Sequence, residues 1–280
     1  VLSRFLHQLS LTIMKLEFGN YDYGVRLTMD YEKVLSIIKE KIDRRMENNL
    51  PDSRYYEFCN ADDNGNYKSE FLDLYDGCGW TRSFLTGIVA YLYFHYKDEK
   101  YLDYLNKQKE VYDTYLYAKL SDISHDVGFL YSLYSGALYE LTGDKEAFRM
   151  NLRAADELSK RFIPKPGIIN GFGDPEGEVI CPIIDDLMNI SLLMWAWRKT
   201  EHPYYKRLFT SHLKTVKKYM IRDNFTVRHS YLFEENTGEP LGERNFCGFS
   251  VGSVWARGQM WALYGLINVM KTTEDYTLYG

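Results

Sequence analysis

One pattern occurs four times along this chain and limits the folds that it can adopt. Each copy is a segment that is apolar nearly all round, then a short acidic turn, then an amphipathic segment. The apolar segments span 80–96, 126–141, 184–199 and 255–270, and the turns that follow them begin at Lys97, Thr142, Thr200 and Thr272. A helix that is apolar all round has to be surrounded by protein. Each unit therefore predicts a helical hairpin with a buried first helix and a half-exposed second helix.

Hairpins whose first helices are enclosed pack most simply as two concentric rings. We therefore predict an all-α fold, an (α/α) toroid of helical hairpins that forms one domain over residues 1–280. An open α-solenoid is the alternative, because a repeat alone does not prove that a ring closes. The sequence stops inside the fourth unit and starts without Met. We expect from this a toroid that is incomplete at its C-terminus, and a start that is a fragment or processed.

The segments outside the repeat give three further expectations. Residues 30–49 have apolar side chains at helical spacing with charges opposite, which predicts an amphipathic helix. Residues 51–79 are polar and rich in Gly, Asn and Asp, which predicts a loop. Residues 224–254 lie between the third and fourth units and predict an inserted hairpin or long loop. Insertions usually lie on the functional face of such an array, so we expect this one at the mouth of the site.

The charge and composition exclude several functions. A formal net charge of −5, with scattered lysines and arginines, leaves no basic surface for nucleic acid or an anionic membrane. No apolar run approaches the roughly 20 residues of a membrane span, and the first residues do not resemble a secretory signal. The cysteines lie far apart, which fits neither a zinc site nor a disulfide framework; they are Cys59, Cys78, Cys181 and Cys247. We expect no metal and a cytoplasmic location.

Residues capable of chemistry precede or open the buried segments. They are Trp80, His125, Asp126, the pair Asp185-Asp186, Arg257 and Trp261. Because equivalent ends of the inner helices meet at one mouth of a ring, we expect these side chains to share one cleft. Each also has a structural interpretation taken alone: an aspartate as a helix cap, a tryptophan as core, a histidine as a surface residue, an arginine as an ion-pair partner. Their position at one end favours a functional site.

Five motifs together resemble the unsaturated glucuronyl hydrolases, glycoside hydrolase family 88, from about Trp80 to the C-terminus. The motifs are Trp80-Thr81-x-x-Phe84 with Gly87, His125-Asp126-x-Gly128-Phe129, Ile183-Ile184-Asp185-x-x-Met188-Asn189, His229-x-Tyr231-x-Phe233 with Thr237-Gly238, and Trp255-Ala256-Arg257-Gly258-Gln259-x-Trp261. The unsaturated rhamnogalacturonyl hydrolases share the toroid and the second aspartate, but the His-Asp-x-Gly-Phe pattern favours family 88. The resemblance implies a toroid of six hairpins with no metal or organic cofactor.

The resemblance also implies a reaction. Its substrates are oligosaccharides, of glycosaminoglycan or similar origin, that polysaccharide lyases leave with a 4,5-unsaturated uronic acid at the non-reducing end. Asp185 would donate a proton to C4 of this vinyl ether and then activate water for attack at C5, with Asp126 ionised beside it. A helix N-terminus lowers a carboxyl pKa, but burial and a second carboxylate raise it again. Substrate contacts would come from Trp80, His125, His229, Arg257 and Trp261.

Two departures from the family pattern keep other functions open. Residues 245–252 read Asn-Phe-Cys-Gly-Phe-Ser-Val-Gly where the family has a polar run, and Arg82-Ser83 replaces a pair of the Asn-Gly type. A catalytically impaired toroid that binds acidic sugars is therefore the second hypothesis. A helical-repeat scaffold for protein partners is the third, and it predicts acids that are dispersed instead of gathered.

Overall fold

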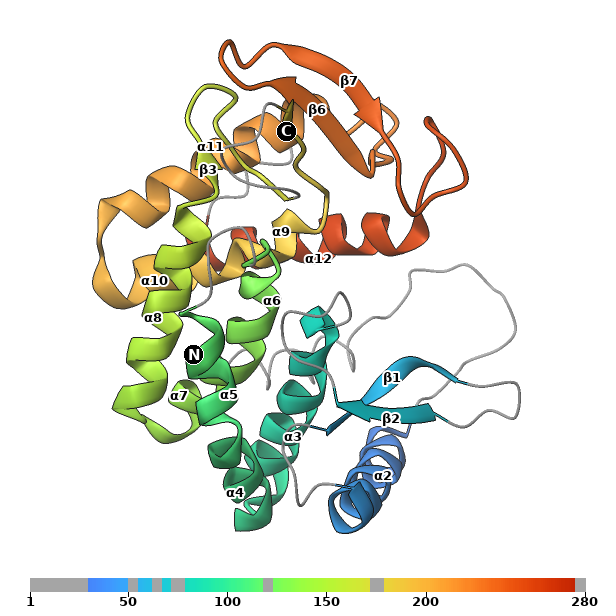
Figure 1. Cartoon of the computed structure of the whole chain (residues 1–280), viewed down its shortest axis with the longest axis vertical. Helices are drawn as coiled ribbons and strands as arrows, with labels where there is room; N and C mark the ends of the chain where they lie inside the picture. Colours follow the sequence, from blue (N-terminus) through green and yellow to red (C-terminus); the bar gives the residue numbers. More distant parts are fainter. Residues whose placement is uncertain are drawn as a thin grey trace.

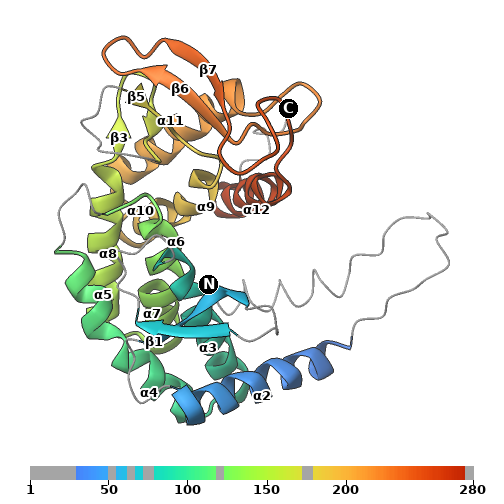
Figure 2. The ribbon, with the colours of Figure 1, turned by 45° about the vertical axis from the view of Figure 1, so that its right-hand side comes forward.

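The computed structural model describes residues 30–49, 55–61, 67–71, 79–117, 123–171 and 179–274. Within these ranges the chain is mostly helical. The helices follow an arc in two layers, with the N-terminal elements at one end and the last helix with a small sheet at the other (Figures 1 and 2). This arrangement is the layered architecture that the repeated hairpins predict.

The inner layer holds the four apolar segments. These are η1 (Gly79–Thr81) with α3 (Arg82–Tyr96); α6 (Val127–Tyr131), η2 (Ser132–Gly136) and α7 (Ala137–Thr142); α9 (Asp186–Asn189) with α10 (Ser191–Thr200); and α12 (Ala256–Thr273). The outer layer holds α4 (Glu99–Lys107), α5 (Lys109–Tyr115), α8 (Lys145–Ser159) and α11 (Pro203–Tyr219). Because α3 packs against α4, α6 against α8 and α10 against α11, three predicted hairpins are confirmed, together with the inner helix of the fourth.

The hairpins share one turn geometry, which explains the acidic turns in the sequence. Each inner helix ends at a residue in the left-handed region whose backbone N–H donates to the carbonyl four residues earlier; these residues are Lys97, Gly143 and Glu201. The next residue accepts a backbone N–H with its side chain and caps the outer helix; these caps are Asp98, Asp144 and His202. One left-handed residue and one cap are enough to reverse the chain within two residues.

Two glycines let the inner helices approach the short helix α9. A Cβ atom on Gly128 of α6 would lie 2.4 Å from the Cα atom of Asn189, and one on Gly265 of α12 would lie 2.4 Å from the carbonyl oxygen of Leu187. Both contacts are with backbone, so any larger residue would push α9 away. The position of α9 is therefore fixed from both sides by residues that have no side chain.

The predicted insertion at residues 224–254 contains a β-hairpin. Strands β6 (Ser230–Glu234) and β7 (Pro240–Arg244) pair antiparallel, and β5 (Val179–Ile180) extends the sheet beside β6. The ladder continues beyond the sheet, because Ile183 bridges Ser230 and the Ile184 N–H donates to the His229 carbonyl at 2.9 Å. The segment that leads into Asp185 is thus hydrogen-bonded to the insertion.

Local details differ from the sequence prediction at several places. The polar segment 51–79 was expected to be a loop, but it contains the antiparallel pair β1 (Tyr55–Ala61) and β2 (Tyr67–Phe71). The outer helix of the first hairpin breaks at Gln108, whose buried side chain accepts a bond from Arg82 at 3.3 Å. The element η2 is π-helical, and two-residue strands β3 (Phe162–Ile163) and β4 (Ile168–Ile169) follow α8. The amphipathic helix α2 (Tyr31–Asn49) is confirmed.

Helix α12 carries an apolar stripe on one face. Its members are exposed, and they are Met260, Leu263, Tyr264 and Ile267. They follow helical spacing, so they form a patch and not isolated exposed side chains. Within the described ranges, no helix has the length and apolar character that crossing a membrane requires. The acidic turn predicted at 272–276 lies partly outside the described residues.

Candidate active site

Two aspartates stand at the N-termini of neighbouring inner helices. Asp126 is the N-cap residue of α6 and Asp185 is that of α9, yet neither side chain makes a capping hydrogen bond. The helices pack closely, and the Phe129 N–H donates to Asn189 Oδ1 at 2.8 Å. The interpretation of these acids as mere helix caps therefore does not hold. The structure brings them to one end of the inner layer.

Asp185 is a buried carboxyl group, and one of its oxygens has no hydrogen-bond partner among the described residues. Asp185 is only 7% exposed, and this oxygen is its Oδ2 atom. Burial raises the pKa of Asp185 to about 6; His125 opposes this rise, and the charges of Asp126 and Asp186 add to it. A carboxyl group with this pKa can hold a proton near neutral pH and give it to a substrate.

His125 lies between carboxylates and not on an open surface. The residue is 2% exposed, with Nδ1 at 2.6 Å from Asp186 Oδ1 and Nε2 at 3.5 Å from Asp126 Oδ1. Burial alone would lower the pKa of His125, but the charges of Asp126, Asp186 and Asp185 outweigh it and raise the pKa to about 9. Both ring nitrogens therefore face protein carboxylates, and the contact of His125 with the hydroxyls or the carboxylate of a substrate stays a prediction.

Four aromatic rings line the same end of the inner helices. Phe129 contacts Trp80 at 5.7 Å and Trp261 at 5.2 Å between ring centroids, and Phe84 joins the group at 5.9 Å from Trp80 and 6.3 Å from Trp261. Among the described residues, the buried Trp261 Nε1–H has no acceptor. Trp80 and Trp261, which were both predicted from the sequence, therefore lie in one aromatic cluster. The indole N–H of Trp261 is suited to donate to a bound hydroxyl.

Arg257 and His229 lie at the rim of this cluster. The exposed Arg257 guanidinium lies 4.3 Å from the Trp255 ring and 5.8 Å from the Trp80 ring, and it forms no ion pair within the described ranges. His229 is buried, and burial lowers its pKa, as does Arg257, although Asn245 opposes the shift. An arginine without a carboxylate partner beside aromatic rings can receive an anionic sugar.

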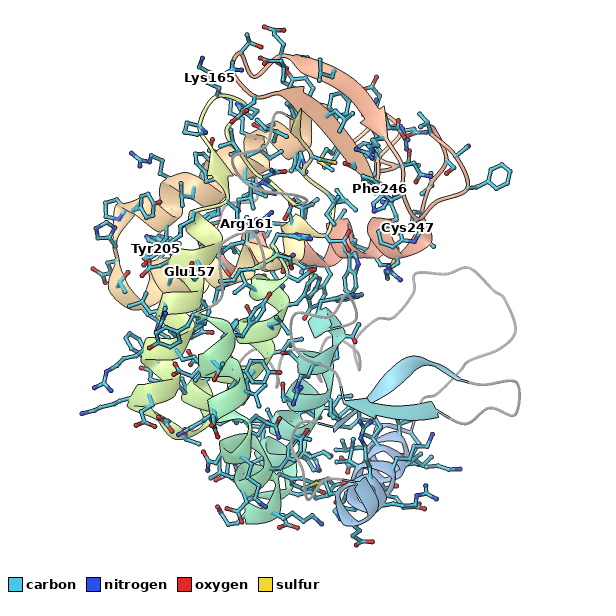
Figure 3. The ribbon with its side chains drawn as sticks, viewed as in Figure 1. Glu157, Arg161, Lys165, Tyr205, Phe246 and Cys247 are labelled. Atoms are coloured by element: carbon cyan, nitrogen blue, oxygen red, sulfur yellow. The ribbon has the colours of Figure 1, made fainter. Side chains whose placement is uncertain are left out.

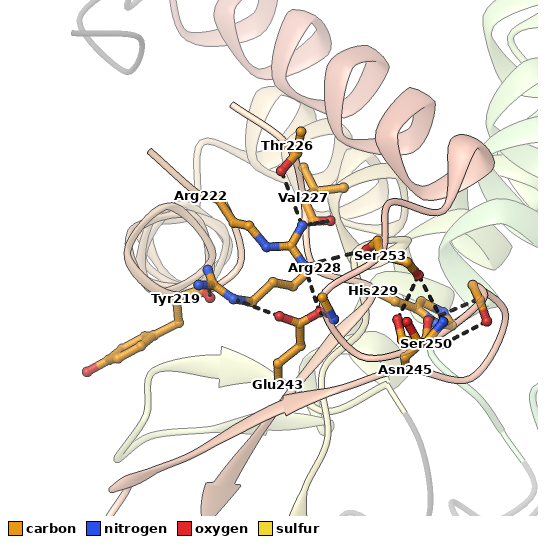
Figure 4. A network of polar contacts seen from close by, with 12 residues as sticks. Tyr219, Arg222, Thr226, Val227, Arg228, His229, Glu243, Asn245, Ser250 and Ser253 are labelled. Atoms are coloured by element: carbon orange, nitrogen blue, oxygen red, sulfur yellow. Dashed lines mark hydrogen bonds and ion pairs between the residues drawn. The ribbon is translucent and has the colours of Figure 1, made fainter. Parts of the chain in front are cut away.

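The loop after β7 closes one side of the rim. His229 Nδ1 accepts the backbone N–H groups of Phe246 and Cys247, at 3.0 and 3.2 Å. The base of the loop is held by Glu243, which pairs with Arg222 at 2.7 Å and Arg228 at 3.2 Å (Figure 4). The exposed Phe246 and Cys247 lie beyond β7, near the start of α12 (Figure 3). The run that departs from the family pattern is therefore held by hydrogen bonds to His229.

Comparison with known proteins finds similar sequences. No family model matches the chain. It is 32% identical over 202 residues to an unsaturated chondroitin disaccharide hydrolase of Streptococcus agalactiae and 33% identical over 197 residues to an unsaturated glucuronyl hydrolase of Bacillus sp. strain GL1. These alignments cover 72% and 69% of this chain, and 51% and 52% of the relatives. The matched part of the chain is similar to the unsaturated glucuronyl hydrolases. It spans about half the length of these curated relatives.

Solved structures show the same similarity in the fold. The crystal structure of the unsaturated glucuronyl hydrolase from Streptococcus agalactiae superposes with a TM-score of 0.78 at 28% identity. The match covers 91% of this chain and 63% of that chain. The fold is accordingly the (α/α) toroid of the unsaturated glucuronyl hydrolases, and the open-solenoid alternative falls away.

Sequence reasoning missed two residues of this site. Asp186 was grouped with Asp185 as a further acid, but its partnership with His125 depends on the packing of α9 against the His125 segment. Asn189 is part of the third motif, but no role was assigned to it. Their spacing of three residues within one helical turn was the available signal, since it places both side chains toward one neighbour. In the described ranges, no group of three or more His, Cys, Asp and Glu side chains could hold a metal ion.

Proposed function

We propose that this chain is a hydrolase that removes a 4,5-unsaturated uronic acid from the non-reducing end of lyase-derived oligosaccharides. The observation that carries the proposal is the buried Asp185 carboxyl, which has a pKa of about 6 and an unpartnered Oδ2 beside Asp126. The relatives named above as unsaturated chondroitin disaccharide and unsaturated glucuronyl hydrolases support the substrate class. A scaffold for protein partners is disfavoured, because the acids are gathered.

The reaction uses one carboxyl group twice. Protonated Asp185 gives its proton to C4, and positive charge develops at C5 and the ring oxygen. The Asp185 carboxylate then takes a proton from water as the oxygen of that water bonds to C5. The resulting hemiketal opens at the C5–O bond to a ketone, and C1, now a hemiacetal carbon, expels the remaining sugar as an alcohol. Asp126 would stabilise the developing charge, and Trp80 and Trp261 would stack on sugar rings.

Activity should depend on pH through Asp185. The reactive form is the protonated carboxyl, so kcat/KM should fall as the pH rises through about 6, the pKa of Asp185. His125, with a pKa of about 9, keeps its charge across this range. The test follows the ultraviolet absorbance of the conjugated double bond of an unsaturated disaccharide between pH 4 and 9. Circular dichroism at each pH serves as the folding control, and a rate that still rises above pH 7 would contradict the assignment.

Arg257 should supply affinity for the substrate carboxylate. Arg257→Ala should raise KM by about 10- to 100-fold, since a hydrogen bond to a charged group is worth about 1.5–3 kcal/mol. Arg207→Ala is the matched control, because Arg207 also lies over a ring, that of Tyr204, but on the outer helix α11. Equal KM values for both variants would rule out this role.

The same absorbance assay distinguishes the hydrolase from the second hypothesis, a catalytically impaired toroid that binds acidic sugars. The apolar rim at Phe246 and the thiol of Cys247 stand where family members carry polar residues, which favours a toroid that binds acidic sugars without turning them over. Binding of an unsaturated disaccharide with no loss of absorbance would support this alternative. We further propose a cytoplasmic location, which is consistent with the free thiols of Cys181 and Cys247.

A further inference from the structure

One imidazole connects acids from two inner helices. Asp186, which follows Asp185 on α9, is fully buried, and its Oδ1 lies 2.6 Å from His125 Nδ1. Its second oxygen, Oδ2, accepts the backbone N–H of Ile183 at 3.0 Å. Both oxygens of Asp186 are therefore committed to the protein, and no surface of this carboxylate is available to a sugar.

The opposite side of the ring faces the candidate site. His125 Nε2 lies 3.5 Å from Asp126 Oδ1, while Asp126 Oδ2 accepts the Ser124 hydroxyl at 3.1 Å. Asn189 packs against the ring from α9: its Oδ1 accepts the Phe129 N–H at 2.8 Å, and its Nδ2, which lies 3.0 Å from His125 Nδ1, donates to the Asp185 carbonyl oxygen at 3.4 Å. A chain of contacts thus runs from the buried Asp186 through His125 to the partly exposed Asp126, whose side chain is 21% accessible.

We propose that Asp186 is a positioning residue: it fixes the ring of His125 with the Nδ1–H toward itself, so that the Nε2–H faces Asp126 and orients that carboxylate beside Asp185. The catalytic meaning of this arrangement rests on the function proposed above, but the arrangement itself does not. It goes beyond that function because it gives the second acid of the Asp185-Asp186 pair a task that neither binds sugar nor transfers a proton to it.

The charges around His125 explain why the loss of Asp186 should change the protonation of the imidazole ring. The charges that raise the pKa of His125 come from Asp126 at the start of α6 and from Asp186 and Asp185 at α9, and the imidazole of His212 from α11 also interacts with His125. His212 accepts the Ile169 N–H with Nδ1, and burial lowers its pKa to about 4, so it is neutral. Asp186 is the only one of the three acids within 3 Å of the ring. Its removal should therefore make the charged form of His125 less stable.

The arrangement can be tested by nuclear magnetic resonance on the chain labelled with ¹⁵N-histidine. In the wild type, both nitrogens of His125 should stay protonated well above pH 7. Asp186→Asn should shift the His125 titration at least one pH unit lower, a tenfold change in proton affinity. Asp223→Asn, the same change at an exposed residue, should leave it in place. The His212 signal reports whether the fold is kept. An unchanged His125 titration in folded Asp186→Asn would overturn the proposal.

A second measurement needs no variant that could misfold. A 2.6 Å bond from an imidazole to a carboxylate should deshield the Nδ1–H proton of His125 strongly and protect it from exchange with water. Absence of such a proton in the wild type would also overturn the proposal.

Kinetics then connect the arrangement to catalysis. Asp186→Asn should lower kcat about tenfold or more with KM changed less than about threefold, because no sugar contact is lost. A wild type without turnover refutes the proposed function, while the resonance measurements still decide the positioning of His125. A wild type that turns over, with a folded Asp186→Asn variant of equal kcat, refutes the positioning role alone.

Discussion

Replacement of Asp185 by asparagine should lower turnover by about 10²- to 10⁴-fold, the range that general acid–base catalysis supplies. Asparagine keeps the shape of the side chain but can neither give a proton to C4 nor take one from water. The loss of ultraviolet absorbance of an unsaturated disaccharide measures the effect. Asp223→Asn, the same change at an exposed turn residue, should keep the wild-type rate. An Asp185→Asn variant within tenfold of the wild type would remove Asp185 from the mechanism.

The same variant should be more stable than the wild type at alkaline pH. The pKa of Asp185 is about 6 in the folded chain, against an ordinary value of 3.8, so the fold disfavours its ionised form. This cost is absent below pH 4, grows as the pH rises through 6 and is complete above it, where it is on the order of 3 kcal/mol. Urea unfolding at pH 4 and pH 8 should therefore show a gain for Asp185→Asn only at the higher pH. A gain at neither pH would mean that the carboxyl is not destabilised in the fold.

Alanine in place of Gly128 or Gly265 should lower the free energy of unfolding by about 1–3 kcal/mol, and more if the helices cannot move apart. Each new methyl group would meet backbone of α9 at 2.4 Å. The loss is expected even though alanine favours a helix interior over glycine by about 1 kcal/mol. Because α9 follows directly after Asp185, both variants should also lose activity. Urea unfolding and the absorbance assay measure the two effects.

Gly87 provides the control for this pair. It also lies in an inner helix, α3, but a methyl group there would first meet the flexible Leu133 side chain, at 3.3 Å, and the Leu133 carbonyl oxygen only at 3.7 Å, an ordinary contact distance. Gly87→Ala should therefore change stability by less than about 1 kcal/mol, in either direction. If the three alanine variants behave alike, the close approach to α9 does not matter to the fold.

Much of the helical architecture was predictable, because it depends on local periodicity. The apolar runs and the acidic turns between them fix helix type and hairpin order, and a cap such as Asp144 beside the left-handed Gly143 can be read from neighbouring residues. The strands β1 and β2 were missed because the sequence between and around them is rich in turn-forming residues, which favours a loop on local grounds. The break at Gln108 was missed because the contact made there, a bond from Arg82, joins residues 26 positions apart and has no local signal.

The candidate site was predictable in its acids but not in their arrangement. Position at the start of buried segments was enough to identify Asp126 and the pair Asp185-Asp186. It could not distinguish Asp185, whose Oδ2 has no hydrogen-bond partner among the described residues, from the adjacent Asp186, whose two oxygens both bind protein groups. Position in the sequence also could not show that His125 lies between Asp126 and Asp186, because that depends on how the His125 segment packs against α9. Such distinctions arise from contacts about 60 residues apart in sequence.

The hydrogen bond from the Ile184 N–H to the His229 carbonyl has a consequence for how specificity can evolve. His229 also accepts hydrogen bonds from the loop that carries Phe246 and Cys247. The loop that would contact the sugar and the backbone next to Asp185 are therefore both hydrogen-bonded to His229. A substitution that reshapes the loop for a different oligosaccharide would also shift the donor. Selectivity and rate should then change together across variants of this hairpin.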